Sequence, residues 1–423
     1  MDEASPPPDA KPHILVLGAG IVGLCVGWHL ARQGARVTVL DRLGPGEGTS
    51  SGNAGAISAG SVAPLAMPGV LKQVPSMLLD PKGGLYIPAS YWPAAFPWLW
   101  KFVLSARPDR VAAIADALAS LLRGAEERHR EILAAEGAED LIVERGQLYL
   151  YRDAEHLAKD DAAWALRREH GLDMRVLTRG GIEELEPEVA PGYTTGVFLP
   201  QQGHCVNPLR MARVIARGIE RMGGTIRRGE GRALITDGNR VTGVSTDAGP
   251  LHADVTVLAA GAWSARLLAP LGIRVPLESQ RGYHVMLPDP GVMPRRPVVP
   301  ADRKAFLTPM EEGLRIAGTV EFGGLDREPT AERAALLLDD LRKVYPQART
   351  ENAKPHWMGH RPCLPDSVPV IGPVKARPGL WCAFGHGHLG LTGAPPTGAL
   401  VAAHLLGPPP NTSLDPFAVE RFA

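Results

Sequence analysis

The sequence has few cysteines and few aromatic residues, and it carries no net charge. Four cysteines occur in 423 residues, and none of them forms a CxxC pair. Such sparse, separated cysteines are typical of buried thiols in a reducing compartment and argue against a disulfide framework. Lysine plus arginine and aspartate plus glutamate number 45 each, so the excess of basic residues typical of nucleic-acid-binding proteins is absent.

The first residues lack the apolar stretch of a signal peptide or a membrane anchor, because Met1–Pro12 is acidic and rich in proline. We therefore expect a disordered tail over residues 1–11 and a cytoplasmic protein. The composition, with 45% hydrophobic and 21% charged residues, is that of a globular protein. A chain of 423 residues is long enough for two or three domains and a buried cofactor.

Strand and helix signals alternate at both ends of the chain, which predicts an α/β fold. His13–Leu17 is an apolar run typical of a buried strand, a helix follows from about Ile21 to Gln33, and Arg36–Leu40 is a second strand. This βαβ unit opens a doubly wound, Rossmann-like sheet. Further strands are expected at 226–228, 233–236, 241–246 and 255–258, and helices at 108–136, 208–222 and 331–344.

A glycine-rich turn, Gly18–Gly23, joins the first strand to the first helix and has the pattern GxGxxG. Gly18 permits the tight turn, Gly20 lets the backbone approach a pyrophosphate, and Gly23 lets the helix pack close to the strand. The helix start at Ile21 and Val22 supplies free N–H groups and a positive dipole end for phosphates. Because strand, turn and helix occur in the right order, we predict dinucleotide binding here.

An acidic residue, Asp41, ends the second strand 21 residues after Gly20, where it can accept hydrogen bonds from ribose hydroxyls. Arg42 beside it could instead pair with the 2′-phosphate of NADP, but the charge of Asp41 would repel that phosphate. Both residues are therefore candidates for binding the nucleotide ribose.

Two further segments favour FAD over NAD. Ser50–Gly55 (SSGNAG) is small and polar, which lets the backbone lie close to a long, flat ligand. Gly385–Thr392 (GHGHLGLT) opens a helix that runs to about Leu406. Such a helix start can hold the partial negative charge of a reduced flavin, whereas NAD needs no second anion site.

The sequence resembles the flavin-dependent D-amino acid dehydrogenase and oxidase superfamily, and is most similar to its bacterial D-amino acid dehydrogenases. The likeness extends from His13 to the last helix. It implies an FAD domain interleaved with an α+β substrate domain that contains an antiparallel sheet. The matching blocks are Val16–Gly23, Thr49–Ser58, Pro64–Gly69, Ala253–Trp263, Gly282–Val285, His360–Gly372 and Gly385–Thr392.

The resemblance also implies where the two domains divide. The FAD-binding domain would comprise residues 12–62, 200–268 and 355–423, and the substrate domain residues 63–199 and 269–354.

Cofactor contacts follow from the same resemblance. Ser51, Asn53 and Ala54 would lie near the flavin or its phosphates, and Gly261 and Trp263 would form a second turn on the nucleotide side. A backbone contact to adenine is implied within residues 230–233. The loop before the last helix would contribute Gly387, His388, Leu389, Gly390, Leu391 and Thr392.

Some members of the superfamily hold flavin covalently through a cysteine. The matching position in this chain is Gly359, and Cys363 does not match it. The resemblance therefore implies noncovalent FAD.

Two residues are implied to bind the substrate. Arg361, within His360–Pro362, would grip the substrate carboxylate, which suits a guanidinium fork that stays charged. Tyr283 would lie over the substrate, where its hydroxyl could hydrogen-bond the carboxylate. From the residues alone, a structural arginine and a packed core tyrosine remain open alternatives.

The implied reaction is oxidative deamination of a small amino acid, foremost a D-amino acid, by hydride transfer from Cα to flavin N5 without a dedicated base. Glycine, sarcosine, hydroxyproline or an L-amino acid are alternative substrates. Alternatives of another class are an NAD(P)H-linked flavin reductase and a non-catalytic flavin-binding protein. We expect no metal, because His386 and His388 belong to the flavin loop and His356 and His360 do not lie on a helix.

Seven aromatic residues fall between Tyr86 and Phe102, among three prolines that exclude a regular membrane-spanning helix. One interpretation is a patch that touches the inner face of a membrane, where a dehydrogenase passes electrons to a quinone. The other is a buried wall of the substrate domain. The electron acceptor, oxygen or a membrane quinone, depends on this choice.

Overall fold

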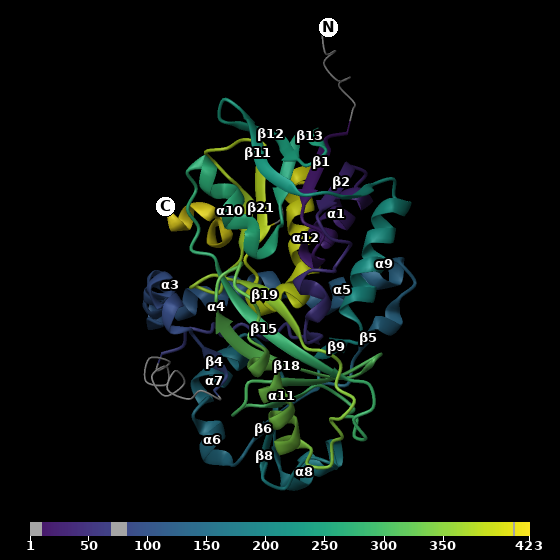
Figure 1. The fold of residues 1–423 in the computed structure, drawn as a ribbon, viewed down its shortest axis with the longest axis vertical. Helices are drawn as coiled ribbons and strands as arrows, with labels where there is room; N and C mark the ends of the chain where they lie inside the picture. The colour runs from purple at the N-terminus through teal and green to yellow at the C-terminus, as the bar shows by residue number, and fades with distance from the viewer. Residues whose placement is uncertain (1–10, 69–82, 409–410) are drawn as a thin grey trace.

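Two large sheets lie one above the other along the long axis of the molecule (Figure 1). The computed structural model describes residues 11–68, 83–408 and 411–423, so Lys11 alone of the predicted tail is described. The upper sheet has the order β10-β2-β1-β14-β21-β20 and is parallel except for β20, which confirms the predicted doubly wound α/β fold. Its strands are β1 (His13–Leu17), β2 (Arg36–Asp41), β10 (Thr225–Arg228), β14 (Val255–Leu258), β20 (Val370–Pro373) and β21 (Leu380–Phe384).

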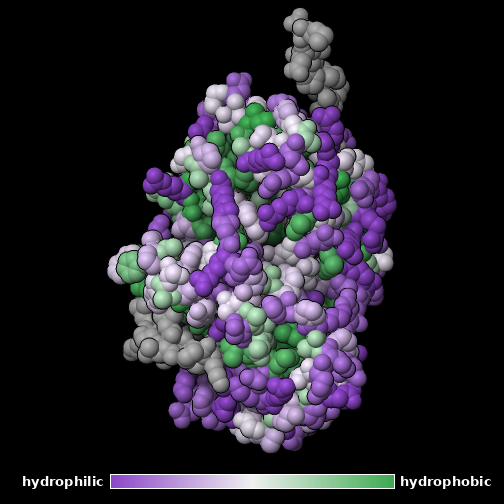
Figure 2. Space-filling view, in the orientation of Figure 1, coloured by the Kyte–Doolittle hydropathy of each residue, from purple (hydrophilic) through white to green (hydrophobic). Residues whose placement is uncertain are grey.

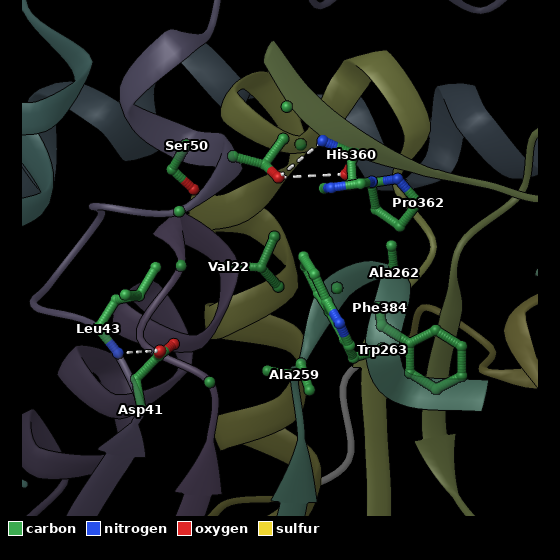
Figure 3. A pocket seen from close by; sticks show the side chains of 18 of the residues that line it. Val22, Asp41, Leu43, Ser50, Ala259, Ala262, Trp263, His360, Pro362 and Phe384 are labelled. Atoms are coloured by element: carbon green, nitrogen blue, oxygen red, sulfur yellow. Dashed lines mark hydrogen bonds between the residues drawn. The ribbon is translucent and has the colours of Figure 1, made fainter. Parts of the chain in front are cut away.

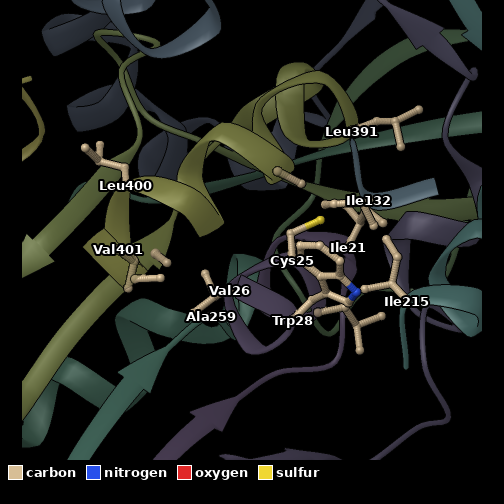
Figure 4. Close-up of a cluster of buried hydrophobic side chains, with 14 of the residues drawn as sticks. Ile21, Cys25, Val26, Trp28, Ile132, Ile215, Ala259, Leu391, Leu400 and Val401 are labelled. Carbon is tan, nitrogen blue, oxygen red and sulfur yellow. The ribbon is translucent and has the colours of Figure 1, made fainter. Parts of the chain in front are cut away.

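Three helices cover one face of this sheet and form the main apolar core with it. In Figure 4, Trp28 of the first helix lies beside Ile215, and Val26 of the same helix points toward Val401 and Ala259. A three-stranded meander covers the other face, where Val244 packs with Leu15 in a second buried cluster. The helices are α1 (Ile21–Arg32), α9 (Pro208–Arg221) and α12 (Gly390–Leu406), and the meander is β11 (Gly231–Asp237), β12 (Arg240–Thr246) and β13 (Gly249–His252).

The single long helix predicted over residues 108–136 is wrong, because two helices occupy this segment. They are α4 (Pro108–Leu122) and α5 (Ala125–Ala135). Gly124 separates them with a φ of 71°, a left-handed conformation that ends the first helix at little steric cost. The apolar 3.6-residue pattern continues across the break, because Leu118 and Ile132 join the core formed by α1 and α12.

Helices α1 and α12 approach each other closely at a glycine. A Cβ atom on Gly398 would lie 2.4 Å from the backbone oxygen of Cys25. We therefore expect Gly398→Ala to lower the free energy of unfolding by about 2 kcal/mol, because overpacking outweighs the better helix propensity of alanine. Chemical unfolding would measure this effect. Gly192→Ala is the matched control, because a Cβ there meets no atom within 4 Å, and equal stability of both variants would contradict the prediction.

The lower sheet is mostly antiparallel and has the order β19-β15-β18-β17-β16-β6-β8-β7, with β4 beside β18. Helix α11 (Ala331–Val344) packs on one of its faces, where Leu337 joins Leu148 and Ile316 in a buried cluster. The strands are β4 (Leu85–Tyr86), β6 (Gln147–Tyr151), β7 (Arg175–Thr178), β8 (Thr195–Leu199), β15 (Glu278–Leu287), β16 (Val298–Pro300), β17 (Phe306–Met310), β18 (Gly313–Phe322) and β19 (Trp357–Cys363).

The remaining elements connect or flank the two sheets. A small sheet of three strands has the order β3-β9-β5 and ties the loop after β2 to the segment after α5. Within the described residues, every helix is too short or too polar to span a bilayer. The elements are β3 (Ala56–Ile57), β5 (Ile142–Val143), β9 (Gly203–Cys205), α3 (Trp92–Ser105), α6 (Ala154–Ala158), α7 (Asp161–Glu169), α8 (Arg179–Leu185) and α10 (Ser264–Leu268).

Candidate functional site

A cavity of about 810 Å³ lies where the carboxyl ends of β1, β2, β14 and β21 meet β19 of the lower sheet. In an open α/β sheet this edge is the usual place for a ligand. Figure 3 shows Asp41 at one side of the cavity, with Val22, Trp263 and His360 facing the same space from three other segments. Of the predicted cofactor residues, the cavity is lined by Gly18, Gly20, Ile21, Val22, Asp41, Arg42, Asn53, Gly261, Trp263, Gly387, Gly390 and Leu391.

The three glycines of the GxGxxG turn, Gly18, Gly20 and Gly23, differ in what surrounds them. Gly18 has a φ of 119°, and a Cβ there would lie 2.3 Å from the oxygen of Ala259. A Cβ on Gly23 would lie 2.0 Å from the oxygen of Gly18, so this glycine allows close packing and does not line the cavity. A Cβ on Gly20 would meet only the Ser50 hydroxyl, at 3.4 Å. Gly20 therefore keeps open the space above the start of α1.

The helix start is held by a serine that the sequence analysis did not single out. Ser50 Oγ accepts a hydrogen bond from the Ile21 amide at 2.9 Å, and both residues line the cavity. This hydroxyl satisfies one of the free N–H groups at the start of α1 and is placed to contact an anion bound there.

The carboxylate of Asp41 is fixed by the backbone. It accepts hydrogen bonds from the amides of Ala19 at 2.7 Å and Leu43 at 2.9 Å, the second of which is drawn in Figure 3. The next residue, Arg42, places its guanidinium carbon 4.3 Å from the ring centre of Trp263. These contacts preorganise the end of the cavity where a nucleotide ribose is expected.

The loop after β2 reaches the cavity through some of the expected residues but not others. Asn53 lines the cavity, but Ser51 and Ala54 do not. The carbonyl oxygens of Ser51 and Asn53 accept hydrogen bonds from Arg315 at 3.0 and 2.6 Å. Thr49 Oγ1 lies 3.2 Å from both the amide and the carbonyl of His360, so the loop is tied to both sheets.

Some residues of the glycine-rich loop before α12 line the cavity and others do not. Gly387, Gly390 and Leu391 line the cavity, whereas Leu389 is buried in the core. Thr392 is buried as well and accepts a hydrogen bond from the Ser58 amide at 3.1 Å. His388 is exposed but does not line this cavity.

The range implied for adenine reaches the cavity, whereas some other lining residues were missed at the sequence level. At the nucleotide end, residues 230–232 line the cavity together with Gly229, within or next to the range implied for adenine. At the other end the ring of Trp357 forms a wall, because a Cβ on Gly52 or Gly359 would lie 2.2 or 2.1 Å from that ring. No local motif identifies Trp357, because its strand, β19, is held at the cavity by pairing with β15.

An extended dinucleotide such as FAD fits these residues. The cavity joins an open helix start, a fixed acidic side chain and a second glycine-rich helix start, which suit a pyrophosphate, a ribose and a partial negative charge respectively. The matching covalent position is Gly359, and Cys363 does not line the cavity. The residues therefore fit a noncovalently held flavin dinucleotide.

Arg361 lies on β19, on the face of the lower sheet that is opposite to α11. Its Nη1 donates a hydrogen bond of 2.9 Å to the carbonyl of Thr319, whose φ of 59° is strained for a β-branched residue. A Cβ on Gly282 would lie 2.2 Å from Arg361 Nη2, so glycine is needed beneath the guanidinium. Burial lowers the pKa of Arg361, and no carboxylate of the described residues forms an ion pair with it.

The structure argues against the expected role of Tyr283. This tyrosine lies on the other face of the sheet, with 1% of its surface exposed, in the cluster that includes Leu337 of α11. Its hydroxyl donates to Glu321 and accepts from the Thr330 amide. Adjacent residues of a strand point to opposite faces, so Tyr283 and its neighbour Gly282 cannot both lie under the Arg361 guanidinium. Tyr283 is a core residue.

Two histidines near the site have pKa values that are lowered by burial. Burial lowers the pKa of His386 to about 3, and its Nε2 lies 2.9 Å from Thr397 Oγ1. Burial, followed by the charges of Arg281 and Arg42, lowers the pKa of His360 to about 4. Among the residues that the structure describes, no group of three or more His, Cys, Asp or Glu side chains is placed to hold a metal ion.

Comparisons with known proteins agree with this geometry. The family model described as FAD dependent oxidoreductase matches residues 13–404. A D-amino-acid oxidase of Bradyrhizobium diazoefficiens is 38% identical over 416 residues, which cover 97% of this chain and 99% of that protein. A D-amino acid dehydrogenase of the same organism is 32% identical over 419 residues, covering 97% and 99% of the two chains.

A solved structure supports the fold. Glycine oxidase from Geobacillus kaustophilus is 25% identical and superimposes with a TM-score of 0.72, over 97% of this chain and 99% of that chain.

Proposed function

The chain belongs to the family of FAD dependent oxidoreductases, and from this premise we propose that it oxidises a small amino acid, foremost a D-amino acid, to the corresponding imino acid. Water then converts the imino acid to a keto acid and ammonia. The names of the two similar proteins, a D-amino-acid oxidase and a D-amino acid dehydrogenase, support this substrate class.

One observation carries the proposal: among the described residues, the half-buried guanidinium of Arg361 has no carboxylate partner. Arg361 forms its described hydrogen bond with a backbone carbonyl, so most of its donors remain available. A buried cation without a counter-charge is unfavourable, and a ligand carboxylate relieves this by bidentate pairing. The carboxylate shared by all amino acids is a suitable partner.

The residues of this chain would act mainly by positioning the substrate. Arg361 would hold the carboxylate and thereby orient Cα, while the strained Thr319 carbonyl holds the guanidinium in place. The neutral His360 and His386 leave the site without a strong base, which suits hydride transfer from a neutral amine. When bound, FAD supplies the acceptor for the hydride.

Product analysis tests the proposal. The holoenzyme is incubated with D-alanine and a dye as electron acceptor, and pyruvate and ammonia are measured in equal amounts if the proposal is right. L-alanine, glycine, sarcosine and hydroxyproline in parallel decide among the alternative substrates. Flavin reduction by NADPH alone would instead support a reductase.

We also propose that residues 12–62, 200–268 and 355–423 form the FAD-binding domain, and that residues 63–199 and 269–354 form the substrate domain. All strands of the upper sheet fall within the first set, which supports this division. Helices α4 and α5 belong to the second set in sequence but share a core with α1 and α12, so the two domains are closely joined.

We further propose that α3 contacts a membrane surface and that the electron acceptor is a membrane quinone. Trp98 of this helix is buried, but Trp92, Phe96 and Trp100 are 38, 61 and 56% exposed. These three residues recur every four positions and share one face of the helix. Figure 2 shows pale and green surface at the left edge of the molecule, where α3 lies in Figure 1.

The chemistry of this exposed face suits a lipid interface. Tryptophan favours the headgroup region, and the exposed cations of Lys101 on this helix and of Arg107 just after it suit anionic lipids. Trp98 fits the alternative interpretation of a buried wall, because it packs with Phe322 and Cys363. Phe96 and Trp100 do not fit it, because both are exposed.

Vesicle sedimentation tests the membrane contact. We expect the protein to bind vesicles that contain anionic phosphatidylglycerol, and the double variant Phe96→Glu/Trp100→Glu to bind about tenfold more weakly or less. Val176→Glu is the matched control, because Val176 is also 61% exposed but lies on β7. Equal binding of all three proteins, or no binding by any, would contradict the proposal.

A further inference from the structure

A half-buried arginine of the lower sheet, Arg315 on β18, is bonded to the wall of the cavity. Its neighbours Leu314 and Ile316 belong to the buried cluster beside α11, so Arg315 points to the opposite face of the sheet. There its Nη1 donates hydrogen bonds to the carbonyl oxygens of Ser51 at 3.0 Å and Asn53 at 2.6 Å. Because Asn53 lines the cavity, the guanidinium is in direct contact with a residue of the cavity wall.

The same loop meets the end of the cavity that suits a flavin ring. The carbonyl of Gly52 lies 3.2 Å from His284 Nδ1, and the His284 ring stacks on Trp357 with 4.8 Å between the ring centres. Trp357 forms the wall at the end of the cavity away from Asp41. A dinucleotide with its ribose at Asp41 and its pyrophosphate at the start of α1 would have its flavin ring at the Trp357 end.

No carboxylate of the described residues forms an ion pair with Arg315. The charge of Glu312 acts on Arg315, but Glu312 is exposed and pairs with Lys354 at 2.7 Å. Two other titratable groups act on Arg315 or are acted on by it, and both are uncharged at neutral pH. Burial lowers the pKa of His284 to about 3 and raises the pKa of the Cys205 thiol to about 12. The guanidinium of Arg315 is therefore a cation behind the cavity wall that lacks a close counter-charge.

The reaction creates a negative charge close to this cation. When the bond between Cα and its hydrogen breaks, the hydrogen leaves the substrate with both bonding electrons and joins flavin N5. The flavin ring thereby gains one negative charge, and the substrate becomes a positively charged imine. A fixed cation near the ring stabilises the reduced, negatively charged flavin more than the neutral, oxidised one.

We propose that the charge of Arg315 raises the reduction potential of the bound flavin by acting across the loop Ser51–Asn53. A unit charge within about 10 Å changes such an equilibrium by about tenfold or more at the effective dielectric constant of a protein. The inference concerns the FAD cofactor, so it does not depend on which amino acid, if any, is the substrate.

The midpoint potential of the FAD-loaded protein tests the inference. Protein and a reference dye are reduced together by xanthine and xanthine oxidase, so no amino acid is needed. Arg315→Gln removes the charge but keeps an amide donor for the loop carbonyls. We expect flavin reduction in this variant to be about tenfold less favourable, which is about 30 mV more negative for a two-electron couple. Arg315→Lys keeps the charge and should keep the wild-type potential.

Arg377→Gln is the matched control. Arg377 is also half-buried and donates to a backbone carbonyl, that of Leu271 at 3.1 Å, but it precedes β21 and lies at the end of this strand away from the cavity. Its loss should leave the potential unchanged.

Each contrary result has a definite meaning. A wild-type potential in Arg315→Gln would show that the charge does not act on the flavin. An equal shift in Arg315→Lys, or an Arg315→Gln protein that does not fold or take up FAD, would show that the side chain serves to pack the loop. All of these results overturn the inference. If instead no amino acid reduces the flavin, the proposed function fails and the measured potentials still decide the role of Arg315.

Discussion

Arg361→Ala is expected to lower kcat/KM for every carboxylated substrate by about 100- to 1,000-fold, or roughly 3–4 kcal/mol, while FAD remains bound. The guanidinium is half-buried and has no described carboxylate partner, so the substrate carboxylate would be its main counter-charge. Steady-state kinetics with a dye acceptor measure the loss, and the flavin absorbance of the purified variant measures FAD content.

Two control variants separate binding geometry from charge. Arg361→Lys keeps the charge but loses the planar fork, so we expect it to recover only part of the activity. Arg349→Ala removes an arginine whose side chain is 58% exposed and paired with Asp289, and it should behave as the wild type. Unchanged kinetics in Arg361→Ala would show that the substrate carboxylate is bound elsewhere.

Gly20→Val is expected to give a folded protein without FAD. In this structure a Cβ on Gly20 meets only the Ser50 hydroxyl, at 3.4 Å, and the backbone is extended, with a φ of −68° and a ψ of 170°. Valine accepts this conformation, but its methyl groups would fill the space above the helix start where a pyrophosphate is expected. We expect FAD affinity to fall by at least about 100-fold, measured by fluorescence titration of the apoprotein.

Two other glycines make this prediction specific. Gly23→Val should fail to fold, because its Cβ would lie 2.0 Å from the Gly18 oxygen, whereas Gly192→Val should keep both fold and cofactor. A Gly20→Val protein that retains a full complement of FAD would show that the phosphates do not lie over this turn.

The parts of the site that the sequence predicts well are those encoded by neighbouring residues. The turn from Gly18 to Gly23, the strand before it and the helix after it form one continuous segment, so periodicity and glycine spacing are sufficient. For the same reason the strand at Val255–Leu258 and the helix at Ala331–Val344 are found with the predicted bounds. The break at Gly124 was missed, because the apolar pattern runs on through it.

Side-chain direction was harder to predict than strand position. The resemblance implies that Tyr283 lies over the substrate. Side chains alternate along β15, however, so the ring of Tyr283 points toward α11. Ser51 and Ala54 belong to the expected loop, and yet Ser50 and Asn53 are the residues that reach the cavity. A shift of one residue in register is invisible in composition and decides which side chain meets a ligand.

Contacts between segments that are distant in the chain cannot be predicted from a single sequence. Arg315 is far in sequence from the loop whose carbonyls it binds, and Trp357 reaches the cavity from a strand segment that no motif marks. Their roles depend on the packing of the two sheets, which only the three-dimensional structure reveals.

The most direct test of this account is anaerobic mixing of the purified, FAD-loaded protein with D-amino acids and with the corresponding amines that lack a carboxylate. We predict that the flavin absorbance near its visible maximum is lost with a D-amino acid such as D-glutamate and is retained with the decarboxylated amine. An absorbance that persists with every amino acid, or that is lost equally with the amine, would contradict the central claim that a carboxylate-anchored amino acid is the reductant.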